Sequence, residues 1–83
     1  MKVTVRYFAS IREAIGLAQE QRETTAGTLA ALRDELTALG GAYAQSLARG
    51  KAVRLALNQV MCDESAALVD GAEVAFFPPV TGG

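Results

Sequence analysis

Histidine is absent from the 83 residues of this sequence, and cysteine occurs once, as Cys62. Without histidine, Ser-His-Asp and Cys-His catalysis are excluded, because the general base is missing. A single cysteine cannot form an internal disulfide, and together with the lack of histidine it argues against a structural zinc site. We therefore expect no metal site. Cys62 follows Val60 and Met61, so it is interpreted as a small hydrophobic residue rather than a nucleophile.

An excess of positive charge and a long apolar run are also missing. Eight Lys and Arg residues stand against nine Asp and Glu, and they are scattered along the chain. This pattern lacks the clustered basic face that nucleic-acid binding needs. No apolar run approaches the roughly 18 residues of a membrane span, and residues 1–6 alternate instead of forming the apolar block of a signal peptide. These observations predict a reduced, cytoplasmic protein without a nucleic-acid or membrane partner.

What is present is enough apolar sequence for one folded domain. The composition is 51% hydrophobic and 20% charged, which is ordinary for a globular protein. The length leaves no room for a second core. We expect a single domain over residues 1–77 and an extended C-terminal tail over residues 78–83.

The first 24 residues predict two strands around a short helix. Residues 2–8 alternate, with Val3, Val5 and Tyr7 on one side, and Lys2, Thr4, Arg6 and Phe8 on the other. A short helix is expected at 11–15, with Ser10 as its N-cap and Gly16 at its end. Residues 17–24 are polar and charged, which is typical of an edge strand that resists pairing with other chains.

The main helix is expected to follow Thr28, which is a good N-cap. One apolar stripe is predicted by leucines three or four residues apart: Leu29, Leu32, Leu36 and Leu39. Three charged residues are expected to face water: Arg33, Asp34 and Glu35. Gly40-Gly41 should end this helix, and residues 42–49 suggest a further helical turn.

The remaining sequence predicts three more strands. Residues 53–57 alternate, Asn58-Gln59 reads as a tight turn into 60–62, and a strand at 73–77 ends where Pro78-Pro79 offers no N–H to the ladder. One amphipathic helix among five strands most simply covers one face of a mixed sheet, which is an α+β roll. The leucine stripe should then cover these residues: Val3, Val5, Tyr7, Val53, Leu55, Val74 and Phe76.

The sequence ends in Gly82-Gly83, which contributes little to stability because glycine loses much backbone freedom on folding. The two residues can be a frayed end without function. They also suit the presentation of a backbone carboxylate, because a tip without Cβ atoms fits a narrow channel. Residues 78–83 can reach about 20 Å when extended, and the two prolines stiffen the first part of this flexible tail.

Candidate partner contacts lie beside this tail. If Val74 and Phe76 face the helix, Phe77 points to the opposite sheet face, where an exposed aromatic ring would suit a partner contact. The alternative is that a loop or the 11–15 helix covers the ring. Met61 is a weaker candidate of the same kind. Arg12 could make a polar contact at the rim or be a solvated charge.

Four segments together resemble the β-grasp sulfur-carrier proteins, which are ubiquitin-like, and most closely the small subunits of molybdopterin synthase. These segments span nearly the whole chain: residues 3–16, with Tyr7-Phe8-Ala9 and Ile11-Arg12-Glu13; Leu57-Asn58-Gln59; residues 68–74; and Phe76-Phe77-Pro78-Pro79-Val80-Thr81-Gly82-Gly83. Ubiquitin-like carriers share the final diglycine, whereas the Phe-Phe-Pro-Pro-Val-Thr stem is far more restricted.

The resemblance implies a β-grasp roll that works as a sulfur carrier in molybdenum cofactor biosynthesis. A ubiquitin-activating-enzyme-like adenylyltransferase would use ATP to adenylate Gly83, and a sulfurtransferase or desulfurase would supply the sulfur for a thiocarboxylate. The tail would then enter the large subunit of a heterotetrameric synthase and donate sulfur to the pyranopterin precursor. Gly82 would pass through the narrow part of the partner site, and Pro78, Pro79, Val80 and Thr81 would line the contact. The carrier would bind no cofactor and would be the sulfur-donating rather than the catalytic subunit.

Two alternatives stay open at this stage. One is another β-grasp protein, either a carrier for thiamine, tRNA thiolation or cysteine synthesis, or a ubiquitin-like modifier, although the stem before the diglycine argues against it. The other is a passive interaction module in which Gly82-Gly83 is incidental. The modifier would form isopeptide adducts, and the passive module would tolerate a blocked C-terminus.

Overall fold

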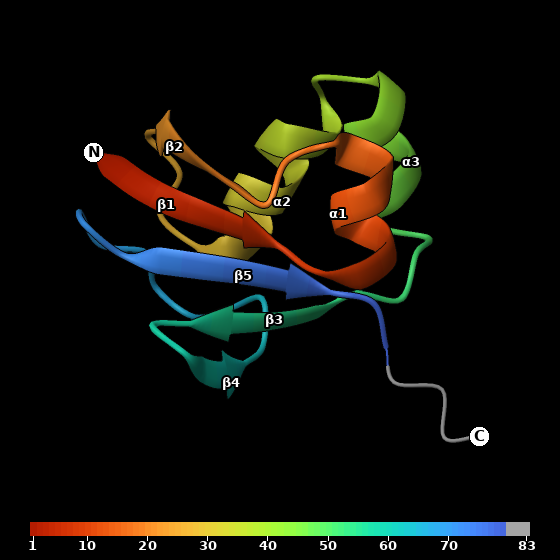
Figure 1. The fold of residues 1–83 in the computed structure, drawn as a ribbon. Coiled ribbons are helices and arrows are strands. Elements are labelled where there is room, and N and C mark those ends of the chain that lie inside the picture. The colour runs from red at the N-terminus through yellow and green to blue at the C-terminus, as the bar shows by residue number, and fades with distance from the viewer. Residues whose placement is uncertain (80–83) are drawn as a thin grey trace.

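A computed structural model describes residues 1–79; Val80, Thr81, Gly82 and Gly83 lie outside the described residues. The elements follow in this order: β1 (Lys2–Tyr7), α1 (Ala9–Ile15), β2 (Gln19–Glu23), α2 (Leu29–Thr37), α3 (Gly41–Leu47), β3 (Arg54–Leu57), β4 (Val60–Cys62) and β5 (Glu73–Phe77). All five strands predicted from the sequence are present (Figure 1). In the described part of the chain, no helix is both long and apolar enough to cross a membrane.

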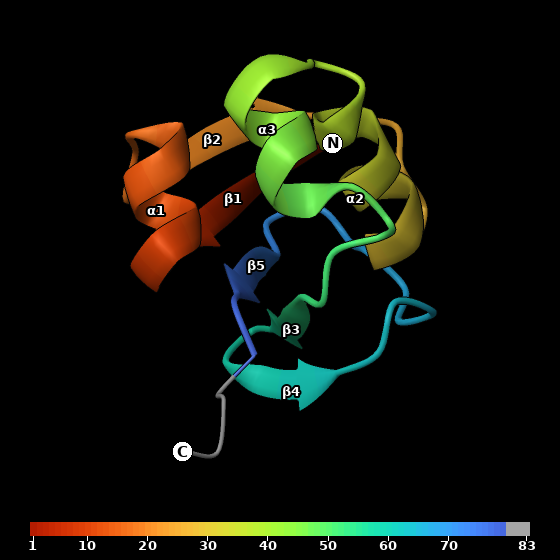
Figure 2. The same cartoon turned by 90° about the vertical axis from the view of Figure 1, so that its right-hand side faces the viewer.

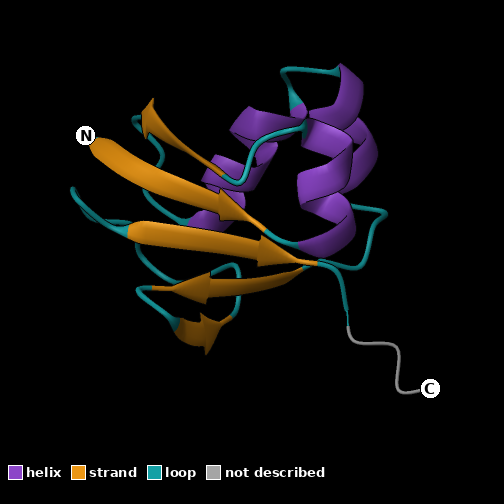
Figure 3. Ribbon diagram, in the orientation of Figure 1, coloured by secondary structure: helices purple, strands orange, loops and turns teal. Residues whose placement is uncertain are grey.

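The strands form one mixed sheet in the order β2-β1-β5-β3-β4. The two central strands, β1 and β5, run parallel, whereas β2, β3 and β4 pair antiparallel with their neighbours. β2 lies at one edge, as its charged sequence predicts (Figure 3). A parallel pair needs a crossover, and the helices supply it between the N-terminal and C-terminal strands.

All three helices lie on the same side of this sheet (Figures 1 and 2). The core between the two layers contains these buried apolar residues: Val3, Val5, Tyr7, Ile11, Ala26, Leu29, Leu32, Leu36, Leu47, Leu55, Leu68, Ala72, Val74 and Phe76. Six of the seven strand residues expected under the leucine stripe belong to this buried core, and Val53 packs against it half-buried. The α+β roll predicted from the sequence is confirmed, with a five-stranded sheet, the main helix α2, the expected short helix α1, and a third helix, α3, where only a further helical turn was expected.

The N-cap expected at Ser10 is wrong, because α1 begins two residues earlier than expected, at Ala9 instead of Ile11. The chain turns through a positive φ of 51° at Ala9, and the carbonyl of Phe8 accepts from the backbone N–H groups of Ile11 and Arg12. Phe8 therefore holds the cap position without a side-chain hydrogen bond. The predicted end at Gly16 is confirmed by a left-handed φ of 86°.

The cap of α2 is confirmed, since the Thr28 hydroxyl accepts from the N–H of Ala31 at 3.2 Å. The helix ends at Thr37, so Leu39 does not continue the stripe and is 49% exposed. The expectation that Arg33 faces water is also wrong, because its residue is only 4% exposed. The segment after α2 forms a complete helix, α3, whose C-terminal end receives the Arg33 side chain.

A second polar contact ties α3 to the sheet. The hydroxyl groups of Tyr7 and Tyr43 both donate to one carboxylate oxygen of Glu20, each at 2.7 Å. Burial, followed by this hydrogen bond, raises the pKa of Tyr7 well above its usual range. Because the hydroxyl of Tyr7 has a partner, its ring can lie in the core without an unsatisfied polar atom.

Candidate functional site

The site begins where β5 ends, at the segment Phe77-Pro78-Pro79, which we name the tail root. Pro78 is half-buried and Pro79 is exposed, and neither belongs to a helix or strand. Proline has no N–H for the ladder, so β5 stops there and the backbone leaves the sheet. Gly83 and Gly82, the predicted working end, follow outside the described residues, as do Val80 and Thr81.

The strands place Phe77 on the sheet face opposite the helices. Its neighbour Phe76 is fully buried on the helical side, and successive strand residues point to opposite faces. The ring of Phe77 lies 4.9 Å from that of Phe8, centroid to centroid. Neither a loop nor α1 is needed to account for its half-buried state, because Phe8 covers it partly. The pair forms an apolar ridge beside the tail root.

A flat strip of small residues continues this ridge across the sheet. The register places four residues side by side on the same face, in the order Arg6, Ala75, Ala56 and Met61. Ala56 and Ala75 are only 3% and 6% exposed, although they lie on the face without helices. Met61 is 53% exposed at the end of the strip. We name Arg6, Phe8, Arg54, Ala56, Met61, Ala75 and Phe77 the open face.

Cationic side chains lie at the margins of the open face. The guanidinium of Arg6 lies 5.2 Å from the centroid of the Phe8 ring and 3.8 Å from Glu73. Arg54 is the cross-strand partner of Phe77. Arg12 is exposed on α1, one helical turn after Phe8. The structure thus brings two predicted contact residues, Phe77 and Met61, onto one face, with Arg12 on the neighbouring helix.

A groove runs along the other side of the tail root. It is bordered by α1, α3, the loop before β3 and the two prolines, and its lining residues are Ser10, Ile11, Ala14, Gln45, Ser46, Lys51, Ala52, Pro78 and Pro79. Lys51 is the one charged residue in this lining. Small side chains keep the groove shallow and open, so it can receive a protruding segment of a partner but cannot enclose a small ligand.

Sequence reasoning missed part of this site although a signal was present. Alternation along residues 2–8 put Phe8 on the same side as Lys2, Thr4 and Arg6, which is the face of Phe77. The pairing of β1 with β5 then brings the two rings together. The alanine strip and the Lys51 groove had no such signal, because they depend on the strand order and on the position of α3.

The fold and the tail root define a β-grasp protein, in which a mixed sheet holds helices on one face and releases a C-terminal tail from a central strand. The family model described as the ThiS family matches residues 5–83. The chain therefore belongs to the ThiS family.

Two sulfur carrier subunits and one solved complex match this chain over nearly its whole length. The molybdopterin synthase sulfur carrier subunit of Haemophilus influenzae is 41% identical over 81 residues, with 98% of this chain and 99% of that protein covered. The subunit of the same name from Escherichia coli is 40% identical over 81 residues with the same coverage. Among solved structures, the complex of subunits 1 and 2 of the molybdopterin-converting factor from Helicobacter pylori contains a chain with a TM-score of 0.69 and 30% identity, and the match covers 100% of both chains.

Proposed function

We infer that this chain is the sulfur carrier subunit of a molybdopterin synthase and works in molybdenum cofactor biosynthesis. The observation that carries this conclusion is the sequence identity of about 40% to two sulfur carrier subunits over nearly their whole length. The geometry supports it, because β5 ends at Phe77 and the two prolines that follow it lie outside any helix or strand, immediately before the predicted working end.

We propose that the α-carboxylate of Gly83 is the working group. A carboxylate is a poor electrophile, because its negative charge repels nucleophiles. Adenylation by a ubiquitin-activating-enzyme-like adenylyltransferase, which uses ATP, replaces that charge with a good leaving group. The persulfide of a sulfurtransferase or desulfurase then displaces AMP and forms an acyl disulfide at Gly83, and a thiol reductant cleaves the S–S bond and leaves the thiocarboxylate.

The side chains of this protein fit a role in which partner enzymes perform the chemistry and this chain only carries the sulfur. The sequence contains no histidine, so the carrier lacks the commonest general base of proteins. Cys62 has the only thiol group in the sequence. Its partial burial, and secondly the charge of Asp63, raise the pKa of this thiol. A thiol is the less reactive form of cysteine at neutral pH. The carried sulfur is therefore assigned to the main chain at Gly83.

The open face is proposed to bind the large subunit of the synthase. In the Helicobacter pylori complex, a chain similar to this one is found together with subunit 2. The ridge of Phe8 and Phe77 and the exposed side chain of Met61 provide apolar contact area beside the tail. Arg12 is proposed to lie at the polar rim, and Pro78, Pro79, Val80 and Thr81 to form the stem that enters the partner.

The experiment that tests this function is sulfur transfer with purified components. A chain that carries a thiocarboxylate at Gly83 is mixed with the large subunit and the pyranopterin precursor, and molybdopterin is measured. We expect product in proportion to the thiocarboxylate added, with two carriers consumed per dithiolene. A chain with one residue added after Gly83 should give none, because the extra residue displaces the reactive group from its place in the partner.

The matched control is the unmodified chain with its free carboxylate, which should bind the large subunit and transfer nothing. Product from the extended chain would contradict the tail mechanism. Isopeptide adducts of the chain with cellular proteins, isolated under denaturing conditions, would favour the ubiquitin-like modifier in its place.

A further inference from the structure

Four of the eight cations in this chain have no ion-pair partner among the described residues. Arg6, Arg22, Arg33 and Arg49 each lie within ion-pair distance of a carboxylate. The cations without such a partner are Lys2, Arg12, Lys51 and Arg54. A solvated cation is common on protein surfaces, so what matters is where these four lie.

Two of the four lie on opposite sides of the tail root. Lys51 borders the groove together with Pro78 and Pro79. Arg54 is the cross-strand partner of Phe77 on the open face. Lys2, in contrast, lies at the beginning of β1, at the other end of the sheet (Figure 1). The root of the tail is therefore flanked by positive charge from the groove side and from the open face.

Carboxylates on the neighbouring elements leave these two cations unneutralised. Asp63 lines the same hollow as Arg54 but is not within ion-pair distance of it, and its carboxylate accepts hydrogen bonds from the backbone N–H and the hydroxyl of Ser65. Glu64 in that hollow is paired with Arg33 and Arg49. Glu13 on α1 is exposed and makes no ion pair within the described chain, but it does not line the groove.

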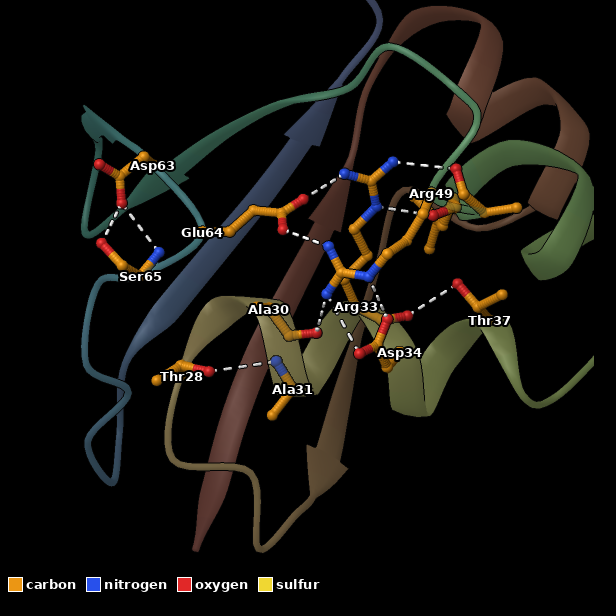
Figure 4. A network of polar contacts seen from close by, with 12 residues as sticks. Thr28, Ala30, Ala31, Arg33, Asp34, Thr37, Arg49, Asp63, Glu64 and Ser65 are labelled. Carbon is orange, nitrogen blue, oxygen red and sulfur yellow. Dashed lines mark hydrogen bonds and ion pairs between the residues drawn. The ribbon is translucent and has the colours of Figure 1, made fainter.

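The segment that ends at Lys51 is held in place by a buried side chain. Arg33 donates from Nε to the carbonyl of Leu47 at 2.6 Å, and from one terminal nitrogen to the carbonyls of Ala48 and Lys51 at 3.0 and 2.8 Å. Its other terminal nitrogen binds Glu64, which also binds Arg49 (Figure 4). The backbone at Lys51 is thus fixed to α2, so the side chain of Lys51 starts from a fixed point beside the tail root.

On the basis of the proposed function, we propose that Lys51 and Arg54 form an electrostatic guide that steers the tail root toward an acidic surface of the adenylating enzyme. Exposed charges contribute mainly to the rate of encounter and little to the lifetime of a complex. That property suits the partner that must bind the carrier, activate it and release it.

The test uses an adenylating enzyme of the source organism selected by one criterion, ATP–pyrophosphate exchange that depends on the wild-type chain. Rates are measured for K51E/R54E, for K51Q/R54Q and for the control K2E. In about 20 mM salt we expect kcat/KM to fall about 10- to 100-fold in K51E/R54E, with kcat changed less than about twofold. The neutral K51Q/R54Q should lie between this variant and the wild type. Near 0.5 M salt the differences should shrink to about threefold or less, because ions screen exposed charges.

Three outcomes would overturn the guide. In the first, kcat/KM of K51E/R54E falls no more than that of K2E. In the second, the fall in kcat/KM persists unchanged at high salt. In the third, kcat/KM falls as much in K51Q/R54Q as in K51E/R54E, which would indicate that the two side chains make direct contacts and do not act through their charge. If association with the large subunit became slower while pyrophosphate exchange stayed unchanged, the two cations would act on the large subunit and not on the adenylating enzyme, and the proposal would be wrong. If no adenylating enzyme responds to the wild-type chain, the proposed function fails instead of the guide. Thermal unfolding of each variant checks that the fold is retained.

Discussion

The rings of Phe8 and Phe77 lie 4.9 Å apart at an interplanar angle of 31°, on the sheet face that carries no helix. The contact joins the end of β1 to the end of β5, at the point from which the tail leaves. Aromatic pairs of this kind contribute about 0.5–1.5 kcal/mol beyond the area that they bury. Each ring also retains exposed surface, so the pair can serve the fold and a partner together.

Replacement of Phe77 should weaken binding of the large subunit. The variant Phe77→Ala removes half of the ridge next to the tail, and we expect a loss of about 2 kcal/mol, or roughly 30-fold in Kd. Titration calorimetry with the large subunit measures this loss. The control is Val69→Ala, which shortens an apolar side chain that is 57% exposed and lies outside the open face. Equal affinities of the two variants for the large subunit would show that Phe77 is not part of the interface.

The turn between β3 and β4 contains strain that a single substitution can relieve. Gln59 has a positive φ of 70°, a conformation that favours glycine. The variant Gln59→Gly should increase the free energy of unfolding by about 0.5–1 kcal/mol. In the control Gln21→Gly, glycine replaces an exposed residue in extended β2, and stability should fall by about 0.5–1 kcal/mol. Urea denaturation measures the free energy of unfolding of both variants. A loss of stability in both would show that the backbone at Gln59 is not strained.

Acid should weaken the structure through Glu64. Hydrogen bonds from Arg49 first, and then from Arg33, hold the pKa of this carboxyl below its ordinary value of 4.5. The unfolded chain therefore takes up the proton first. The stabilisation is present above pH 4.5 and is lost as the pH falls through the lower pKa of the folded state.

The variant Glu64→Gln isolates this effect from that of Asp63, whose pKa is also lowered, by Ser65. We expect the variant to be less stable than the wild type by about 1–2 kcal/mol at neutral pH and to approach it near pH 3. Urea denaturation at both pH values measures the difference. A difference independent of pH would show that the charge of Glu64 does not contribute.

Local sequence patterns predicted the strands and the helix ends that depend on near neighbours. Thr28 caps α2 through a residue three positions away, and Gly16 ends α1 through its own backbone conformation. Alternation also identified the face of Phe77, because the side of a strand is a local property. These features need no knowledge of distant contacts.

Two errors are local, namely the cap expected at Ser10 and the helix expected to continue to Leu39, whereas the error at Arg33 comes from distant parts of the chain. Arg33 is charged and lies beside other charged residues, so its pattern predicts exposure, yet the carbonyls of Leu47, Ala48 and Lys51 surround it once α3 packs against α2. Buried charge is stable when such partners satisfy it. The groove at Lys51 depends on the same packing. Only tertiary structure can reveal both.

The central claim is that sulfur is carried at the α-carboxyl of Gly83, and intact mass measures this directly. The chain is incubated with its adenylating enzyme, ATP and a sulfide donor. We predict a gain of about 16 Da, from the exchange of one oxygen for sulfur, located by fragmentation to Gly83. The gain should be absent when Gly83 is deleted. An unchanged mass, or the same gain on a chain without Gly83, would contradict the account.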